Sequence, residues 1–125
     1  MITEKRRIGN GGEDRAAEYL EDKNYKIIQR NYNTGVGEID IIAQNDKYII
    51  FAEVKTRSEA SLETPAEAVT KAKQRRIIKT TQKYLSENSC SLQPRFDVIE
   101  VITSEDAITG INHLENAFWA GDFDG

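Results

Sequence analysis

Hydrophobic residues recur with helical spacing in two parts of the chain. Residues 12–23 carry an apolar stripe on one side, which predicts a helix from about Gly12 to Lys23. The start of a second helix is indicated by the sequence TPAE. In it, Thr64 has the character of an N-cap, Pro65 suits the first helical position and Glu67 closes a capping box. A long helix is therefore predicted from Thr64 to about residue 86 or 88.

The remaining apolar residues follow strand patterns. The segments that predict strands are 25–32, 36–44, 47–56 and 95–103, with a short last strand in AITGINHL. Residues 44–46, QND, supply turn chemistry for a hairpin. The order α-β-β-β-α-β predicts a single α/β domain with a mixed sheet flanked by helices, preceded by a flexible basic arm over residues 1–11 and followed by a tail over residues 115–125.

The second predicted strand carries two acids inside an apolar run. In GEIDIIA, alternation places Glu38 and Asp40 on one face, with Ile39 and Ile41 on the other. An acid in an apolar strand needs compensation, because a buried charge is costly unless it is paired or bound to metal.

The third predicted strand repeats this arrangement. In FAEVKTR, Glu53 and Lys55 share a face, and Ala52 and Val54 lie opposite. If the hairpin pairs these two strands, the acidic faces coincide. Alternatively, Lys55 and a carboxylate form a surface salt bridge, which contributes roughly 0–1 kcal/mol.

The first predicted helix carries an acid on its apolar side. Glu13 falls in the middle of the stripe made by Ala16, Ala17 and Leu20, whereas Glu18 falls on the far side. Two interpretations stay open. Glu13 is either a solvated first-turn carboxylate favoured by the helix dipole, or a third carboxylate directed toward the face of the sheet that carries the other acids.

The second predicted helix carries a one-sign charge pattern, with six basic residues and no acidic one from Lys71 to Lys83. Its apolar stripe comprises Ala66, Ile77, Ile78, Tyr84 and Leu85, and its basic face comprises Lys71, Arg75, Arg76, Lys79 and Lys83. This face is either a solvated surface or a contact for a phosphodiester backbone. Gln74, inside the apolar stripe, is either a snorkelling boundary residue or a group near a functional site.

Composition narrows the chemistry. The formal net charge is −4, so any nucleic-acid contact must rest on a local basic patch. One cysteine and one histidine exclude an internal disulfide and cysteine-rich or histidine-rich metal sites, so a metal would need oxygen ligands. The sequence predicts no signal peptide, no membrane span and a cytoplasmic location.

These residue types together favour metal-assisted phosphodiester hydrolysis. Asp40 and Glu53 offer the hard oxygen ligands that Mg²⁺ prefers, and the carbonyl of Val54 adds another. Glu13 is expected to reach the metal shell through water. Lys55 would orient or help to deprotonate a water, or stabilise charge that develops on phosphorus.

The sequence GEID, followed after a hairpin by FAEVKTR, resembles the PD-(D/E)XK nuclease superfamily. By this resemblance, Asp40 holds the first acidic position and Glu53, Val54 and Lys55 form the E-x-K element. The stretch GEDRAAEYLEDKNYKIIQRNY resembles the archaeal Holliday-junction resolvase branch, in which the helix acid corresponds to Glu13.

The pattern also resembles the YraN-like family of small bacterial proteins, through GEDRAAEYL, RNY, GEIDII, FAEVKTR, PAEAVTKAKQRRI and RFDVIEV. The resemblance covers about residues 9–103. It implies a restriction-endonuclease-like fold, Mg²⁺ or Mn²⁺ as cofactor and, from the resolvase members, a homodimer. Glu38 belongs to this pattern and is either an extra ligand or a partner for Lys55 or Arg57. Arg57 is expected to touch phosphate or to hold a carboxylate.

The predicted function is that of a metal-dependent endonuclease acting on structured or branched DNA. Two alternatives remain: a nucleic-acid-binding module with this fold and little or no catalysis, and a protein-interaction factor whose carboxylates are structural. At the C-terminus, the neighbouring Phe118, Trp119 and Phe123 either cover the core, which is the preferred reading, or contact another subunit.

Overall fold

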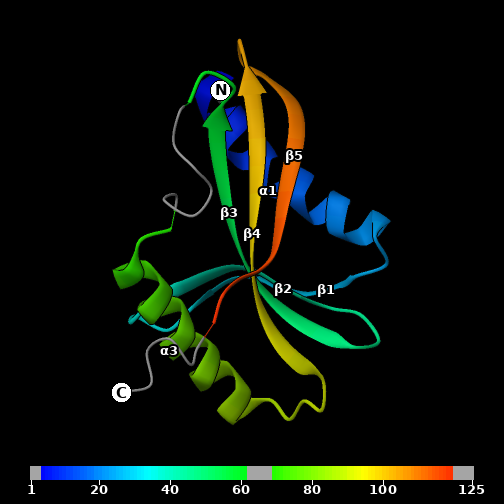
Figure 1. Cartoon of the computed structure of the whole chain (residues 1–125), viewed down its shortest axis with the longest axis vertical. Coiled ribbons are helices and arrows are strands. Elements are labelled where there is room, and N and C mark those ends of the chain that lie inside the picture. Colours follow the sequence, from blue (N-terminus) through cyan, green and yellow to red (C-terminus); the bar gives the residue numbers. More distant parts are fainter. Residues whose placement is uncertain (1–3, 62–68, 120–125) are drawn as a thin grey trace.

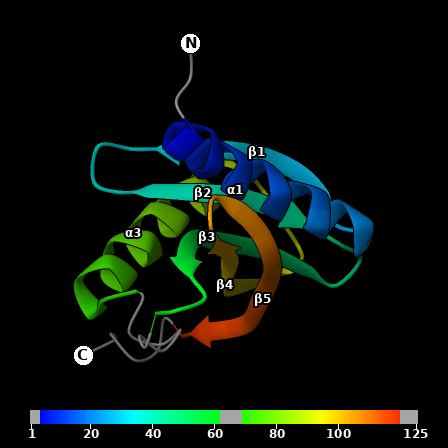
Figure 2. The same cartoon turned by 90° about the horizontal axis from the view of Figure 1, so that it is seen from above.

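A five-stranded mixed sheet lies between two helices. The computed structural model describes the backbone of residues 4–61 and 69–119, and the side chains of that part from Gly11 onward. Helix α1 (Glu4–Asp22) covers one face of the sheet and α3 (Lys71–Glu87) covers the other (Figures 1 and 2). This arrangement confirms the predicted restriction-endonuclease-like α/β fold.

The strands follow one another across the sheet in chain order. Their bounds are β1 Lys26–Asn33, β2 Glu38–Gln44, β3 Tyr48–Ser58, β4 Gln93–Ser104 and β5 Ala107–Phe118. Neighbours pair antiparallel except β3 and β4, which are parallel. The parallel pair requires a crossover, and the segment containing α3 supplies it. The predicted central hairpin is β2–β3, joined by the turn at Asn45.

Three element boundaries differ from the prediction. Helix α1 begins at Glu4, so residues 4–11 are helical rather than the predicted flexible arm. Helix α3 begins after Thr70, whose hydroxyl accepts a hydrogen bond from the backbone N–H of Lys73 at 3.2 Å. The predicted cap TPAE, and Ala66 with it, lie outside the described residues. Strand β5 continues through Phe118, which the sequence had assigned to a tail.

The aromatic residues of this tail divide between core and surface. Phe118 is buried and stacks on Phe96 with ring centroids 5.0 Å apart. Trp119 is 66% exposed, contrary to the preference for a core position. Phe123 lies outside the described residues.

Each face of the sheet has its own hydrophobic core, which confirms the apolar stripes of the helices. Under α1, Ala16, Ala17 and Leu20 pack on strand residues that include Ile41, Ala52 and Val101. Under α3, the buried residues include Ile77, Ile78, Tyr84, Ile39, Phe51 and Val98. The two cores are called the α1-side core and the α3-side core below. Neighbouring residues of one strand, such as Phe51 and Ala52, therefore pack under different helices.

Close packing brings the first part of α1 onto the sheet beside Glu13. A Cβ atom at Gly12 would lie 2.7 Å from the hydroxyl of Thr56, so only glycine fits there without displacing it. Neither described helix, α1 nor α3, is long and apolar enough to cross a membrane.

Candidate functional site

The site begins where strands β2 and β3 stop pairing. Their ladder runs from Gln44 and Ile49 to Ile41 and Ala52, which are the last paired residues. In β2, the residue before Ile41 is Asp40, whose carboxylate accepts a hydrogen bond from the backbone N–H of Val54 at 2.8 Å. The side chain of Asp40 therefore satisfies a donor on β3 where the backbone ladder has ended, and it holds the two diverging strands together.

The strand around Asp40 is not regular. Ile39 packs in the α3-side core and Ile41 packs in the α1-side core, so the predicted placement of both opposite Asp40 is wrong. On β1, Asn31 lies between the residues that pair with Ile39 and Ile41, and it has a φ of 55°. Strict alternation along β2 therefore fails at Asp40, opposite the irregular residue of β1. Glu38, at the start of β2, is exposed.

Glu53 is a buried acid on β3. Its neighbour Ala52 lies in the α1-side core, so Glu53 faces the α3 side. Glu53 is 4% exposed, and its carboxylate forms an ion pair with the ammonium of Lys73 at 2.5 Å. Lys73 was not among the residues singled out from the sequence, where it looked like one more member of a basic helix.

Asp40 and Glu53 lie close enough to influence each other. Burial raises the pKa of Asp40 to about 7, and the negative charge of Glu53 contributes to the rise. The hydrogen bond from Val54 opposes it, the charge of Glu13 adds to it, and the charge of Lys73 opposes it. The carboxylate of Asp40 thus feels the charges of Glu53 on β3 and of Glu13 on α1.

The raised pKa of Asp40 predicts a pH-dependent stability. The pKa of Asp40 is higher in the folded chain than in the unfolded chain. The free energy of unfolding is therefore highest at low pH, where Asp40 is protonated in both states, and falls as pH rises from about 4 to about 7. The loss is at most about 4 kcal/mol. In EDTA, urea unfolding of Asp40→Asn, which does not titrate, should show the variant gaining on the wild type between pH 4.5 and pH 8. A pH-independent difference would contradict this assignment.

Glu13 is held at the edge of the site by β1. Its carboxylate accepts hydrogen bonds from Arg30 Nε and Asn31 Nδ2, both at 3.1 Å, and its side chain is 22% exposed. Arg30 also bonds to Asp14 at 2.7 Å. Across residues 4–61 and 69–119, no three His, Cys, Asp or Glu side chains are grouped so as to hold a metal ion. The candidate oxygen ligands are therefore the carboxylates of Asp40 and Glu53 and the carbonyl of Val54.

Strand β3 continues the polar face beyond Glu53. Lys55 is half-buried and pairs in register with Glu100 of β4. Arg57 Nε lies 3.0 Å from Glu100 Oε2, an ion pair whose two atoms lack hydrogen-bond alignment. Glu100 is fully buried and also accepts a hydrogen bond from Asn112 at 3.0 Å. Glu100 and Asn112 carry no local sequence signal, because each is a single polar residue within a strand pattern.

Helix α3 presents two different polar surfaces. The predicted basic face is exposed and comprises Lys71, Arg75, Arg76, Lys79 and Lys83. Gln74 instead is buried, donates a hydrogen bond to the carbonyl of Val69 at 3.0 Å and has a side-chain oxygen without a hydrogen-bond partner in the described part of the chain. The snorkelling interpretation of Gln74 is therefore wrong, because its side chain is buried and is hydrogen-bonded to the backbone just before α3.

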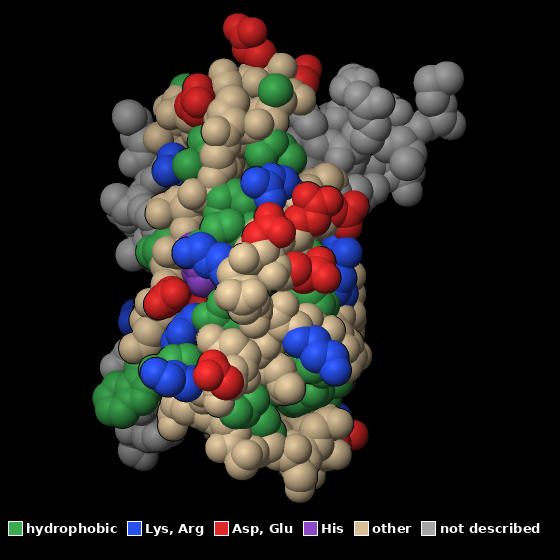
Figure 3. All heavy atoms as spheres, turned by 90° about the vertical axis from the view of Figure 1, so that its right-hand side faces the viewer, with side chains coloured by type: hydrophobic (Ala, Val, Ile, Leu, Met, Phe, Trp, Pro, Cys, Tyr) green, Lys and Arg blue, Asp and Glu red, His purple; other side chains and the backbone are tan. Residues whose placement is uncertain are grey.

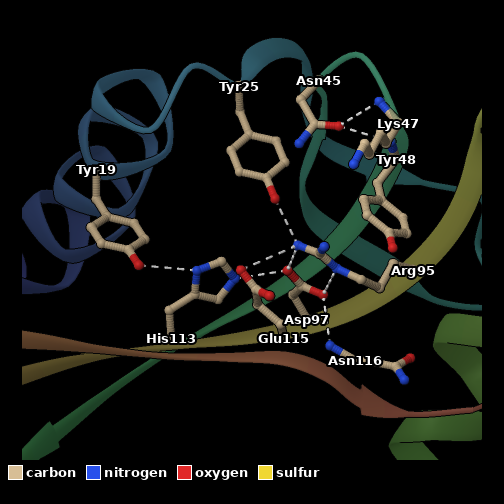
Figure 4. Close-up of polar contacts among 10 residues, drawn as sticks. All are labelled: Tyr19, Tyr25, Asn45, Lys47, Tyr48, Arg95, Asp97, His113, Glu115 and Asn116. Carbon is tan, nitrogen blue, oxygen red and sulfur yellow. Dashed lines mark hydrogen bonds and ion pairs between the residues drawn. The ribbon is translucent and has the colours of Figure 1, made fainter.

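A second polar network lies on the α1 side of the sheet, and the sequence did not indicate it (Figure 4). Arg95 binds Asp97 through two nitrogens at 2.9 and 2.8 Å, and it also donates to the hydroxyl of Tyr25 at 2.7 Å. His113 lies 2.7 Å from Asp97 and 3.0 Å from the hydroxyl of Tyr19. These contacts join α1, β4 and β5.

Asp97 is the centre of this network. It is fully buried, and it also accepts a hydrogen bond from the backbone N–H of Asn116 at 3.1 Å. Burial raises the pKa of Asp97, but hydrogen bonds from His113, Arg95 and Asn116 together outweigh burial and lower the pKa below its ordinary value. The network satisfies its own charges, which is the pattern of a structural cluster.

On the surface around α1 and β5, acidic and basic side chains are interspersed (Figure 3). This mixed pattern contrasts with the single-sign face of α3.

Comparison with known proteins gives a family match over most of the chain. The family described as "Uncharacterised protein family UPF0102" matches residues 12–101. A UPF0102 protein of Caldanaerobacter subterraneus is 44% identical over 91% of this chain and 96% of its own length. A UPF0102 protein of Alkaliphilus oremlandii is 47% identical over 90% and 98%, and one of Symbiobacterium thermophilum is 45% identical over 92% and 98%. The matched residues contain Asp40, Glu53 and the whole of α3.

Proposed function

The chain belongs to the UPF0102 family, as its resemblance to YraN-like proteins predicted, and we propose that it is a metal-dependent endonuclease that hydrolyses phosphodiester bonds of structured or branched DNA. The observation that carries the proposal is the placement of two carboxylates, Asp40 and the buried Glu53, where β2 and β3 stop pairing, with the charge of Glu53 acting on Asp40. Both carboxylates are largely removed from water, and Lys55 follows Glu53 on the same face of β3.

The donor set suits a hard divalent cation. Asp40 and Glu53 supply carboxylate oxygens and Val54 supplies a backbone carbonyl, which are the ligand types that Mg²⁺ and Mn²⁺ accept alongside waters. Burial, and then the charge of Glu53, raises the pKa of Asp40. Glu13, fixed by β1, would act from outside the direct ligand set. A bound cation would supply Lewis-acid polarisation of the phosphate and neutralise developing charge.

The remaining groups of this face have roles that follow from their charge. The ammonium of Lys55 would orient the attacking water or stabilise the negative charge that develops on phosphorus. Arg57, held by the buried Glu100, is pre-positioned to contact a neighbouring phosphate. Glu38, the exposed first residue of β2, is an accessory group in this proposal.

The exposed basic face of α3 is the proposed contact for the DNA backbone. Replacing Arg76 and Lys79 by Gln should weaken binding of a four-way-junction DNA and reduce the slope of log K against log salt by up to about two, because each neutralised phosphate contributes about 0.9. Fluorescence anisotropy in Ca²⁺ at several salt concentrations measures both quantities. Lys47→Gln, at an exposed turn, is the matched control. An unchanged slope in the double variant would make the basic face a solvated surface.

One observation favours a second candidate function. The ion pair with Lys73 neutralises Glu53 without any metal, as would suit a nucleic-acid-binding module that retains this fold and has little or no catalysis. Such a protein would bind DNA through α3 and would not need divalent ions.

A cleavage assay separates the two candidates. Purified protein is incubated with linear, flap and four-way-junction DNAs in Mg²⁺, Mn²⁺ or EDTA, with Glu53→Gln as control. The nuclease proposal expects metal-dependent cleavage of at least one branched substrate and none by the variant. Tight binding with no cleavage in either metal would favour the binding module. Analytical ultracentrifugation of the same samples tests the homodimer that the resemblance to resolvases implies.

A further inference from the structure

Lys73 connects the start of α3 to the buried carboxylate of β3. Its ammonium lies 2.5 Å from Glu53 Oε1, while its own side chain remains 37% exposed. The backbone N–H of Lys73 is bonded to the side chain of Thr70, so the helix start that carries this lysine is itself anchored. Glu53 is 4% exposed, which makes this ion pair the contact that compensates a charge inside the fold.

The ammonium and a divalent cation would compete for the same carboxylate. Glu53 is one of the two side chains proposed to ligate the metal, and one of its oxygens is already paired with Lys73. Two positive charges beside one carboxylate repel each other strongly in a site with little water.

We propose that Lys73 is an internal counter-ion of the candidate active site, which neutralises Glu53 in the metal-free protein and which a divalent cation must displace. The inference rests on the proposed function, because it concerns the loading of the same site. The side chain suits this exchange. A lysine has a flexible four-carbon stem, and Lys73 is partly exposed near the start of α3, so its ammonium can move to solvent or to phosphate.

This role is separate from that of Lys55. Lys55 lies on β3 itself, two residues from Glu53, and in the described part of the chain it forms no ion pair with Glu53. Lys73 comes from another element and reaches Glu53 across the space between helix and sheet. Removal of Lys73 should therefore change metal loading while it leaves the ligands and Lys55 in place.

Calorimetric titration with Mn²⁺ at pH 8 tests the competition. We expect Lys73→Met to bind Mn²⁺ on the order of tenfold more tightly than the wild type, because a neighbouring charge of this kind shifts cation binding at a carboxylate by one logarithmic unit or more. Lys73→Arg, whose fork pairs with a carboxylate more strongly, should bind Mn²⁺ no more tightly than the wild type. Lys47→Met, a remote exposed lysine, should match the wild type.

Thermal unfolding provides a readout independent of the titration. In EDTA, Lys73→Met should have a lower Tm than the wild type, because Glu53 loses its counter-ion inside the fold. Saturating Mn²⁺ should raise the Tm of the variant by more than that of the wild type. This difference should vanish in a Glu53→Gln background, in which there is no carboxylate to compete for.

The outcomes distinguish this inference from the proposed function. Equal or weaker Mn²⁺ binding by Lys73→Met, with normal binding by the wild type, would overturn the counter-ion role and leave the metal site standing. No binding heat and no Mn²⁺-dependent Tm shift in either protein would overturn the metal site, and the counter-ion role with it.

Discussion

Glu53→Gln and Asp40→Asn are each expected to lower the rate of phosphodiester cleavage in Mn²⁺ by on the order of 10³-fold or more. Removing a single preorganised electrostatic group from an active site commonly costs 10²- to 10³-fold, and a ligand of the proposed metal also determines whether the metal binds. Both substitutions keep the size of the side chain. Initial rates on the best substrate of the DNA panel measure the effect.

A control variant and folding measurements show whether the lower cleavage rate reflects the lost carboxylate or a misfolded protein. Asp46→Asn, the same change at an exposed turn, should retain wild-type cleavage. Circular dichroism and thermal unfolding should show that both site variants remain folded. Undiminished cleavage by folded Glu53→Gln or Asp40→Asn would remove these carboxylates from the mechanism.

The second large effect is expected in the polar network of β4. Asp97→Ala should lower the free energy of unfolding by about 3–5 kcal/mol, because removal of one partner leaves a buried charge uncompensated. In this case the group left behind is Arg95, which is almost fully buried and bound to Asp97 through two nitrogens. Its other acidic neighbour, the mostly exposed Glu115, lies 3.9 Å away. His113 and the backbone of Asn116 lose their acceptor as well. Chemical unfolding in urea at pH 7 measures the difference.

The loss of stability in Asp97→Ala should depend on pH, and the pKa of Asp97 gives the direction. Because the pKa of Asp97 is lowered in the folded protein, its stabilising contribution is present above the ordinary carboxyl pKa and is lost as pH falls through the lower, folded value. The gap between wild type and Asp97→Ala should therefore narrow in acid. Asp46→Asn serves as the exposed control. A loss below about 1 kcal/mol at pH 7 would show that the network does not stabilise the fold.

Much of the fold was predictable because its signals are local. The periodicity of Ala16, Ala17 and Leu20 identified the buried side of α1, and the alternation around Ala52 identified the two faces of β3. The turn at Asn45 defined the hairpin. The boundaries were predicted less well: α1 begins at Glu4, whereas the apolar stripe from which it was predicted begins only near Gly12.

The candidate site was predictable only in part. Asp40 and Glu53 were selected because they interrupt apolar strands, and their electrostatic influence on each other agrees with a shared location. The face of Asp40 was derived from strict alternation, which fails between Ile39 and Ile41. Lys73 was hidden among the basic residues of its helix, since nothing in the sequence distinguishes a lysine that turns inward.

The sequence by itself determined the helices and strands, the hairpin that joins the acidic strands, and the single-sign charge of α3. Tertiary structure alone decided that Lys73 neutralises Glu53, that Glu100 holds Arg57, and that Asp97 gathers Arg95 and His113 into one cluster. The physical reason is the range of each effect. Periodicity arises from neighbouring residues along the backbone, whereas the cost and the compensation of a buried charge depend on groups that folding brings from other elements.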